Sequence, residues 1–193
     1  MTPDDAPPTA AAKTTPGGGS AKFHSHRSHI TRIAKQIADA DFGTGPLAEL
    51  RRKDPEAVAS TPAFHRLTAH MEDVSWAGDA LRWATVIQAM AIGTSPGDAL
   101  PSESVGSALA YAGYPESRFA RLLASRGNSF RGQIVLLARY MNAKKVRFDW
   151  RPLGELMLVE GLPAQKERAE ELRFNIARDY YRALEKKQKD AAA

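Results

Sequence analysis

The sequence contains no cysteine, and this absence excludes disulfide bonds, thiol nucleophiles and thiolate metal sites. It also lacks an apolar run long enough to span a bilayer, which takes about 18 residues or more. The N-terminus has no apolar core of the kind that signal peptides carry, so we do not expect export. Together these absences predict a cytoplasmic protein without membrane contact.

The motifs of common catalytic sites are missing as well. No Gly-rich phosphate loop is followed by Lys and Ser or Thr, and no nucleophile elbow surrounds a serine. His24, His26 and His29 have a spacing that suits a metal, but they adjoin a polar tail and lack a nearby carboxylate, so we interpret them as flexible tail residues. His65 and His70 flank one short helix without sharing a face. We expect no enzyme activity, no metal and no cofactor, and a metal-dependent enzyme built on His24, His26 and His29 is the least favoured alternative.

Alternating strand patterns are absent too, whereas helical periodicity covers most of the chain after residue 22. The strongest example is a stripe at helical spacing that ends at Gly93, a residue type that often terminates helices. Its members are Trp76, Ala80, Trp83, Ile87 and Met90. We therefore predict an all-α fold, with two helical-bundle subdomains at 23–93 and 104–190 and a Gly-, Pro- and Ser-rich linker at 94–103.

Residues 1–22 contain four prolines and a glycine triplet, so we predict a disordered tail there. Ser28 and Ser102 are placed to cap the helices that follow them. A turn is expected at 125–128. The last helix is predicted from about Ala164 to about Lys187, as a salt-bridged amphipathic helix.

One stretch carries charge of a single sign. Residues 118–148 hold eight Lys and Arg residues and no Asp or Glu, although the whole chain has a net charge of only +5. Like charges one helical turn apart repel, whereas phosphates would attract them and release counterions. We therefore predict a sequence-tolerant nucleic-acid-binding surface, with an ordinary solvated helix surface as the alternative. Its members are Arg118, Arg121, Arg126, Arg131, Arg139, Lys144, Lys145 and Arg147.

A second binding mode stays open for part of this stretch. Residues 115–140 form two predicted helices joined by a tight, glycine-containing turn, which is compatible with a freestanding helix-turn-helix DNA-binding regulator. Asn128, Ser129 and Gln133 stand where such a reader carries its base-contacting side chains. Aromatic stacking of bases is not expected, because Trp76 and Trp83 lie on a core stripe.

Three blocks of the sequence occur in the order and spacing of a known family. They are GPLAELRRKDPEAVASTPAFHRL at 45–67, VGSALAYAGYPESRFARLLAS at 105–125 and LLARYMNAKKVRFDWRPLGELML at 136–158. On these blocks, and over about 45–168, the chain resembles the small subunit of the type I-E CRISPR Cascade surveillance complex, the CasB family. The resemblance implies an all-α protein of two helical subdomains that has no catalytic activity and takes part in antiviral defence.

The resemblance also implies partners and binding residues. Two copies of the family's protein lie end to end along the crRNA-bound backbone and help to hold the displaced DNA strand of the R-loop. The implied partners are the backbone and large subunits, a second copy of the chain, crRNA and target DNA. Ala138 stands where the family has an arginine, with Arg121 or Lys144 as the substitute. The positions that match family basic residues are Arg52, Arg118 and Arg139, and Lys166 and Arg168 lie near a further basic pair.

Overall fold

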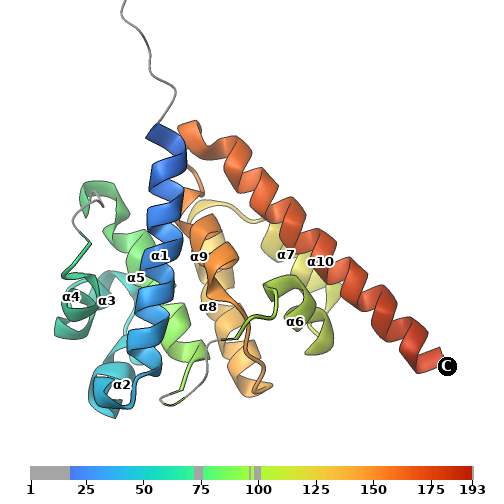
Figure 1. Cartoon of the computed structure of the whole chain (residues 1–193), viewed down its shortest axis with the longest axis horizontal. Helices are drawn as coiled ribbons and strands as arrows, with labels where there is room; N and C mark the ends of the chain where they lie inside the picture. The colour runs from blue at the N-terminus through green and yellow to red at the C-terminus, as the bar shows by residue number, and fades with distance from the viewer. Residues whose placement is uncertain (1–17, 72–75, 96, 98–100, 193) are drawn as a thin grey trace, which may run out of the picture.

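The structure, a computed structural model, describes residues 18–71, 76–95, 97 and 101–192, with the backbone alone at 18–24 and 76–77. Every regular element in these residues is a helix, which confirms the all-α prediction (Figure 1). Among them, no helix has the combination of length and apolarity that crossing a bilayer requires. The α-helices are α1 (Gly18–Ala38), α2 (Thr44–Arg52), α3 (Pro55–Val58), α4 (Pro62–Thr68), α5 (Trp76–Gly93), α6 (Val105–Tyr111), α7 (Glu116–Ala124), α8 (Gly127–Ala143), α9 (Trp150–Val159) and α10 (Lys166–Ala192), with short 3₁₀ turns at Ala40–Phe42 and Pro163–Gln165.

Helix α5 lies at the centre of the fold. The predicted stripe members Trp83, Ile87 and Met90 are fully buried, whereas the side chain of Trp76 lies outside the described residues. The helix ends at Gly93 as predicted, and the ring of Trp150 lies 2.8 Å from the position that a Cβ of Gly93 would occupy. This close approach lets α9 begin against the end of α5.

Helices from both sides of the predicted linker pack together. Helix α1 packs on α9 and α5 packs on α8, while α6 lies along α10. Figure 1 shows α2, α3 and α4 gathered on one side of α1 and α6, α7 and α10 on the other, with α8 and α9 between them. The buried residues of 23–93 and 104–190 belong to one hydrophobic core. The division into two subdomains stays a prediction, and part of the linker lies outside the described residues.

Two helix starts differ from the expectation. Helix α1 begins at Gly18, so Ser28 lies inside the helix, and residues 18–22 are helical rather than disordered. Ile30, Ile33 and Ile37 are fully buried and attach α1 to the core, and the helix continues from them toward the N-terminus although Gly18 and Gly19 have low helix propensity. The remainder of the predicted tail, 1–17, lies outside the described residues. Helix α6 is capped by Ser104, whose Oγ accepts a hydrogen bond from the Ser107 amide at 3.3 Å, and not by Ser102.

The last helix is longer than predicted and is attached to α9 by buried ion pairs. Helix α10 continues to Ala192, and Glu155 of α9 and Glu160, which follows the end of α9, are both buried. Arg168 binds Glu155, and Arg173 binds Glu160 and also Glu170 within its own helix. These pairs fix the position of α10 against α9, and the predicted turn before α8 is present between Ala124 and Gly127.

Candidate nucleic-acid interface

The acid-free stretch folds as two helices that turn back on each other. Tyr114 precedes α7 and Tyr140 lies near the end of α8, yet their rings are 5.0 Å apart in an edge-to-face arrangement. The Tyr140 hydroxyl donates its one proton toward the carbonyl oxygen of Gly113, at 2.9 Å, and that of Ala112 lies 3.2 Å away. The Tyr180 hydroxyl of α10 donates to the carbonyl of Tyr114 at 2.8 Å. Tyrosine side chains therefore connect the start of α7 with the end of α8 and with α10.

Three cations surround this tyrosine pair. Burial raises the pKa of Tyr114, and the positive charges of Arg118 and Arg121, which follow it on α7, act in the opposite direction. The Lys144 ammonium lies 5.8 Å from the centre of the Tyr140 ring. We call Arg118, Arg121 and Lys144 the α7–α8 basic cluster. All three side chains are exposed, and none forms an ion pair in the described part of the chain.

Two further predicted residues lie near this cluster but differ in direction. Lys145 is exposed and follows Lys144 in the left-handed backbone region, with φ of 54°. Arg139 is exposed and precedes Tyr140, but successive side chains of a helix diverge by about 100°, so Arg139 points to another side of α8. The cluster can therefore extend to Lys145, whereas Arg139 is a separate exposed cation.

Arg126 and Arg131 lie at the opposite end of the α7–α8 pair. Helix α8 is 17 residues long, which corresponds to about 25 Å between its ends. Arg126 pairs with Glu170 of α10 at 3.1 Å and donates to the carbonyl of Leu123. Arg131 donates to the side chain of Asn128 in its own helix. Local and long-range partners thus occupy both guanidinium groups, and neither belongs to the cluster.

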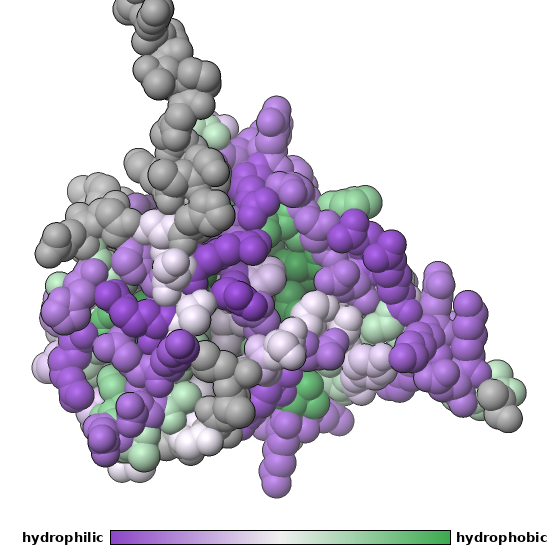
Figure 2. Space-filling view, viewed as in Figure 1, coloured by the Kyte–Doolittle hydropathy of each residue, from purple (hydrophilic) through white to green (hydrophobic). Residues whose placement is uncertain are grey.

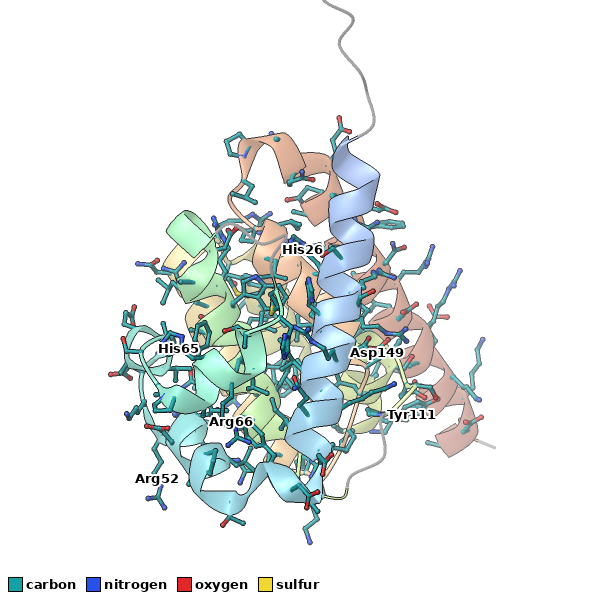
Figure 3. All side chains as sticks on the ribbon, turned by 60° about the vertical axis from the view of Figure 1, so that its left-hand side comes forward. His26, Arg52, His65, Arg66, Tyr111 and Asp149 are labelled. Carbon is teal, nitrogen blue, oxygen red and sulfur yellow. The ribbon has the colours of Figure 1, made fainter. Side chains whose placement is uncertain are left out.

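The structure assigns different environments to the remaining predicted residues. Arg147 is half-buried and lies within 3.4 Å of the Ser95 hydroxyl. Arg52 is exposed at the end of α2, and Figure 3 shows it directed away from the body of the molecule. Lys166 is exposed at the start of α10, whereas Arg168 binds the buried carboxylate of Glu155 and also Glu171. The eleven predicted residues therefore do not form one continuous surface.

A second basic surface was missed by the sequence interpretation. A shallow concavity between α1 and the start of α9 is lined by the hydroxyls of Ser28 and Thr31 and by cations, and Figure 2 shows hydrophilic side chains over this face. Thr31 and Arg151 also line a neighbouring cavity of about 260 Å³ together with Arg147, which places Arg147 beside this surface. We call it the α1–α9 basic surface, and its cations are Arg27, Arg32, Lys35 and Arg151.

A signal for this surface was present in the sequence. From Lys22 to Ala38 the chain holds four cations and no acid. Two of the lining arginines are nevertheless engaged by carboxylates, because Arg27 binds Glu155 and Arg151 binds Asp149. Arg32 is half-buried, its Nη1 donates to the carbonyl oxygen of His70 at 3.2 Å, and its Nε and Nη2 are buried. Phosphate contacts from this surface would therefore depend mainly on Lys35, which is exposed.

The histidines at 26 and 29 are not flexible tail residues. Both lie on α1, and their rings are 6.0 and 6.2 Å from the ring of Trp83 in edge-to-face contact. The side chain of His24 lies outside the described residues. Among the side chains that are described, no group of His, Asp and Glu is arranged to hold a metal ion.

The geometry of α7 and α8 also bears on the helix-turn-helix alternative. The two helices of such a motif cross at about 90–120°, which would separate Tyr114 from Tyr140. Their ring contact requires the helices to fold back instead. In addition, the apolar face of α8 is buried against α5, and Ile134, Leu137 and Ala138 are at most 1% exposed. The structure therefore does not favour a helix-turn-helix reader.

Comparison with known proteins gives a match to one protein family. A family model described as CRISPR-associated protein Cse2 matches residues 46–181, which includes every helix from α3 to α9 and much of α10. None of the curated proteins or solved structures compared with the chain matches it.

Proposed function

The chain belongs to the Cse2 (CasB) family, the small subunits of the type I-E CRISPR Cascade complex, and from this premise we propose that it binds the nucleic-acid backbone through the α7–α8 basic cluster. In this proposal the subunit is not catalytic. It supports crRNA-guided target binding by holding the displaced DNA strand of the R-loop.

The exposure of three unpaired cations around one tyrosine pair is the observation that carries the proposal. Arg118 and Arg121 lie one turn apart on α7, after Tyr114, and the Lys144 ammonium at the end of α8 lies 5.8 Å from the centre of the Tyr140 ring, which contacts Tyr114. Gathering like charges costs free energy in the absence of a ligand, and a phosphate chain removes that cost. The contacts would be made to phosphates, so they position a strand without reading its sequence.

Modest contacts of this kind are sufficient for the task. An R-loop replaces a DNA duplex by a heteroduplex of similar stability, so small protein–backbone contributions decide whether it persists. Base pairing to the guide supplies the specificity. In this proposal the partners are the backbone and large subunits, a second copy of the chain, crRNA and target DNA, and the complex is cytoplasmic.

The proposal is tested in the assembled complex with crRNA and a target duplex. The triple variant Arg118→Ala, Arg121→Ala, Lys144→Ala is compared with a matched triple variant of α10, Arg182→Ala, Lys186→Ala, Lys189→Ala, which removes equal charge from exposed positions. We expect only the first to weaken target retention and to make its dependence on log salt concentration shallower by about 2, since each lost single-strand phosphate contact contributes about 0.7. Equal retention and equal salt slopes for both triple variants would contradict the proposal.

A further inference from the structure

Helix α10 exposes two aromatic side chains on one face. Phe174 is 65% exposed and Tyr181 is 41% exposed, which is unusual for large apolar residues in a protein with a well-filled core. They are seven residues apart, so they lie on the same side of the helix, with Ala177 between them. This face is directed away from the buried stripe that contains Ile176 and Tyr180.

Helix α7 runs beside this aromatic face. The Tyr181 hydroxyl lies 3.1 Å from a carboxylate oxygen of Glu116 at the start of α7, and Arg126 just beyond its end pairs with Glu170. Ala120 and Leu123 follow Glu116 at spacings of four and seven, so they face the same side as Glu116. Two apolar stripes therefore lie next to each other, and we call them the α7–α10 apolar strip: Ala120, Leu123, Phe174, Ala177 and Tyr181.

The charges around the strip differ from those of the α7–α8 basic cluster. Three carboxylates beside it are already engaged: Glu170 by two arginines, Glu171 by Arg168 and Glu116 by the Tyr181 hydroxyl. Arg178 is exposed, lies 5.8 Å from the centre of the Phe174 ring, and has no carboxylate partner in the described part of the chain. The strip thus combines apolar area with one cation that a complementary surface can neutralise.

A phosphate chain fits this face poorly. Glu167 and Glu185 are exposed on the same side of α10 as Phe174, so a strand that followed the strip would pass acidic side chains at both ends. Phe, Tyr and Arg are instead the residue types enriched at the centres of protein interfaces. Two neighbouring apolar stripes can pack against the apolar face of an amphipathic helix.

We propose that the α7–α10 apolar strip is the docking site for a helix of a neighbouring protein subunit, which packs an apolar side chain on Phe174 and places a carboxylate against Arg178. The proposal rests on the function proposed above, because it takes the neighbour to be another protein of the same complex. It assigns assembly to α10 and the outer side of α7, and strand binding to the cluster around Tyr114 and Tyr140.

The test measures incorporation in the absence of target DNA. The labelled chain is titrated into complexes assembled from the backbone and large subunits with crRNA, and the bound fraction is quantified by size-exclusion chromatography and native mass spectrometry. We expect Phe174→Ala with Arg178→Glu to weaken incorporation about tenfold or more. Leu136→Ala is the matched control, since Leu136 is also an exposed apolar residue, 55% exposed, on a different helix. Thermal unfolding of each isolated variant checks that folding is retained, as expected for exposed positions.

The possible outcomes separate the two proposals. If the wild-type chain joins the complex and the double variant joins it equally well, the docking proposal is overturned while the strand-binding proposal stands. If the wild-type chain does not join at all, both proposals fail. Sedimentation of the isolated chain and binding to labelled random-sequence single-stranded DNA and RNA are measured in parallel. A double variant whose only loss is in self-association, or only in strand binding, would assign the strip to a second copy or to nucleic acid and would overturn the docking proposal.

Discussion

Arg168 of α10 contacts a single carboxylate oxygen of Glu155 of α9 through two nitrogens, with Nε at 2.7 Å and Nη2 at 2.6 Å. The Glu155 side chain is fully buried, and its second oxygen accepts from Arg27 of α1. Burial lowers the pKa of Arg168, but its bonds to Glu171 and Glu155 outweigh that effect and raise the pKa overall. One carboxylate therefore links three helices.

We predict a structural role for Arg168 and none for Lys166, although the family resemblance associates both with nucleic-acid contact. Arg168→Ala leaves the buried carboxylate of Glu155 with Arg27 as its single ionic partner, and should lower the free energy of unfolding by about 2–4 kcal/mol. Lys166→Ala, at an exposed position, should change it by less than about 0.5 kcal/mol. Urea denaturation of both variants provides the measurement, and equal unfolding midpoints would exclude the structural role.

A second prediction concerns the close approach of α6 and α10. A Cβ at Gly106 would lie 2.7 Å from the amide nitrogen of Tyr180 and would also collide with the carbonyl oxygen of Ile176, and backbone atoms cannot rotate away. We expect Gly106→Ala to destabilise the protein by about 3 kcal/mol. Gly132→Ala on α8 is the control, because nothing lies within 4 Å of its added methyl group. That change should stabilise the helix by about 0.5–1 kcal/mol, and thermal unfolding that ranks the two variants in the opposite order would refute the packing of α6 on α10.

The third prediction tests which cations act together. Arg118 and Arg121 lie one turn apart and both act on Tyr114, so their alanine substitutions should show coupled effects on single-strand binding in a double-mutant cycle. Arg139 points to another side of α8, and its effect should add to that of Arg118 within about 0.5 kcal/mol. Fluorescence anisotropy with one labelled strand at fixed salt measures both cycles. Strong coupling between Arg139 and Arg118, or no coupling between Arg118 and Arg121, would contradict the membership of the α7–α8 basic cluster.

The helices were largely predictable because their apolar periodicity is local. The stripe of α5, its end at Gly93 and the turn before α8 all depend on residues within a few positions of each other. The start of α1 was predicted too far along the chain, because the composition of residues 18–22 suggested disorder. In the structure these residues continue the helix whose isoleucines are buried in the core. The short helix α3 contains four residues and gave no periodic signal at all.

The candidate site was predictable only in part. The exposure of a helical side chain follows from its local sequence, whereas its ion-pair partner depends on which helices pack together. On a helical wheel Arg118 lies at the edge of the apolar arc of its helix, and Arg121 and Arg139 point away from the apolar arcs of theirs; all three are exposed in the structure. No local pattern could show that Arg126 meets Glu170 or that Arg168 meets Glu155, since these pairs are created by the packing of α10 on α7 and α9. Ala138, the position at which the family resemblance implies an arginine, is fully buried against the core. The substitution of that arginine by Arg121 or Lys144 stays a prediction.

The shared core also has a geometric consequence for any polyanion bound by this chain. The α7–α8 basic cluster and the α1–α9 basic surface belong to helices that pack around the same hydrophobic core. The distance between the two basic surfaces is therefore fixed by the packing of that core. A strand that touches both must span this fixed spacing. Flexible strands are then expected to bind more readily than stiff duplexes, which makes stiffness a criterion of selection alongside charge.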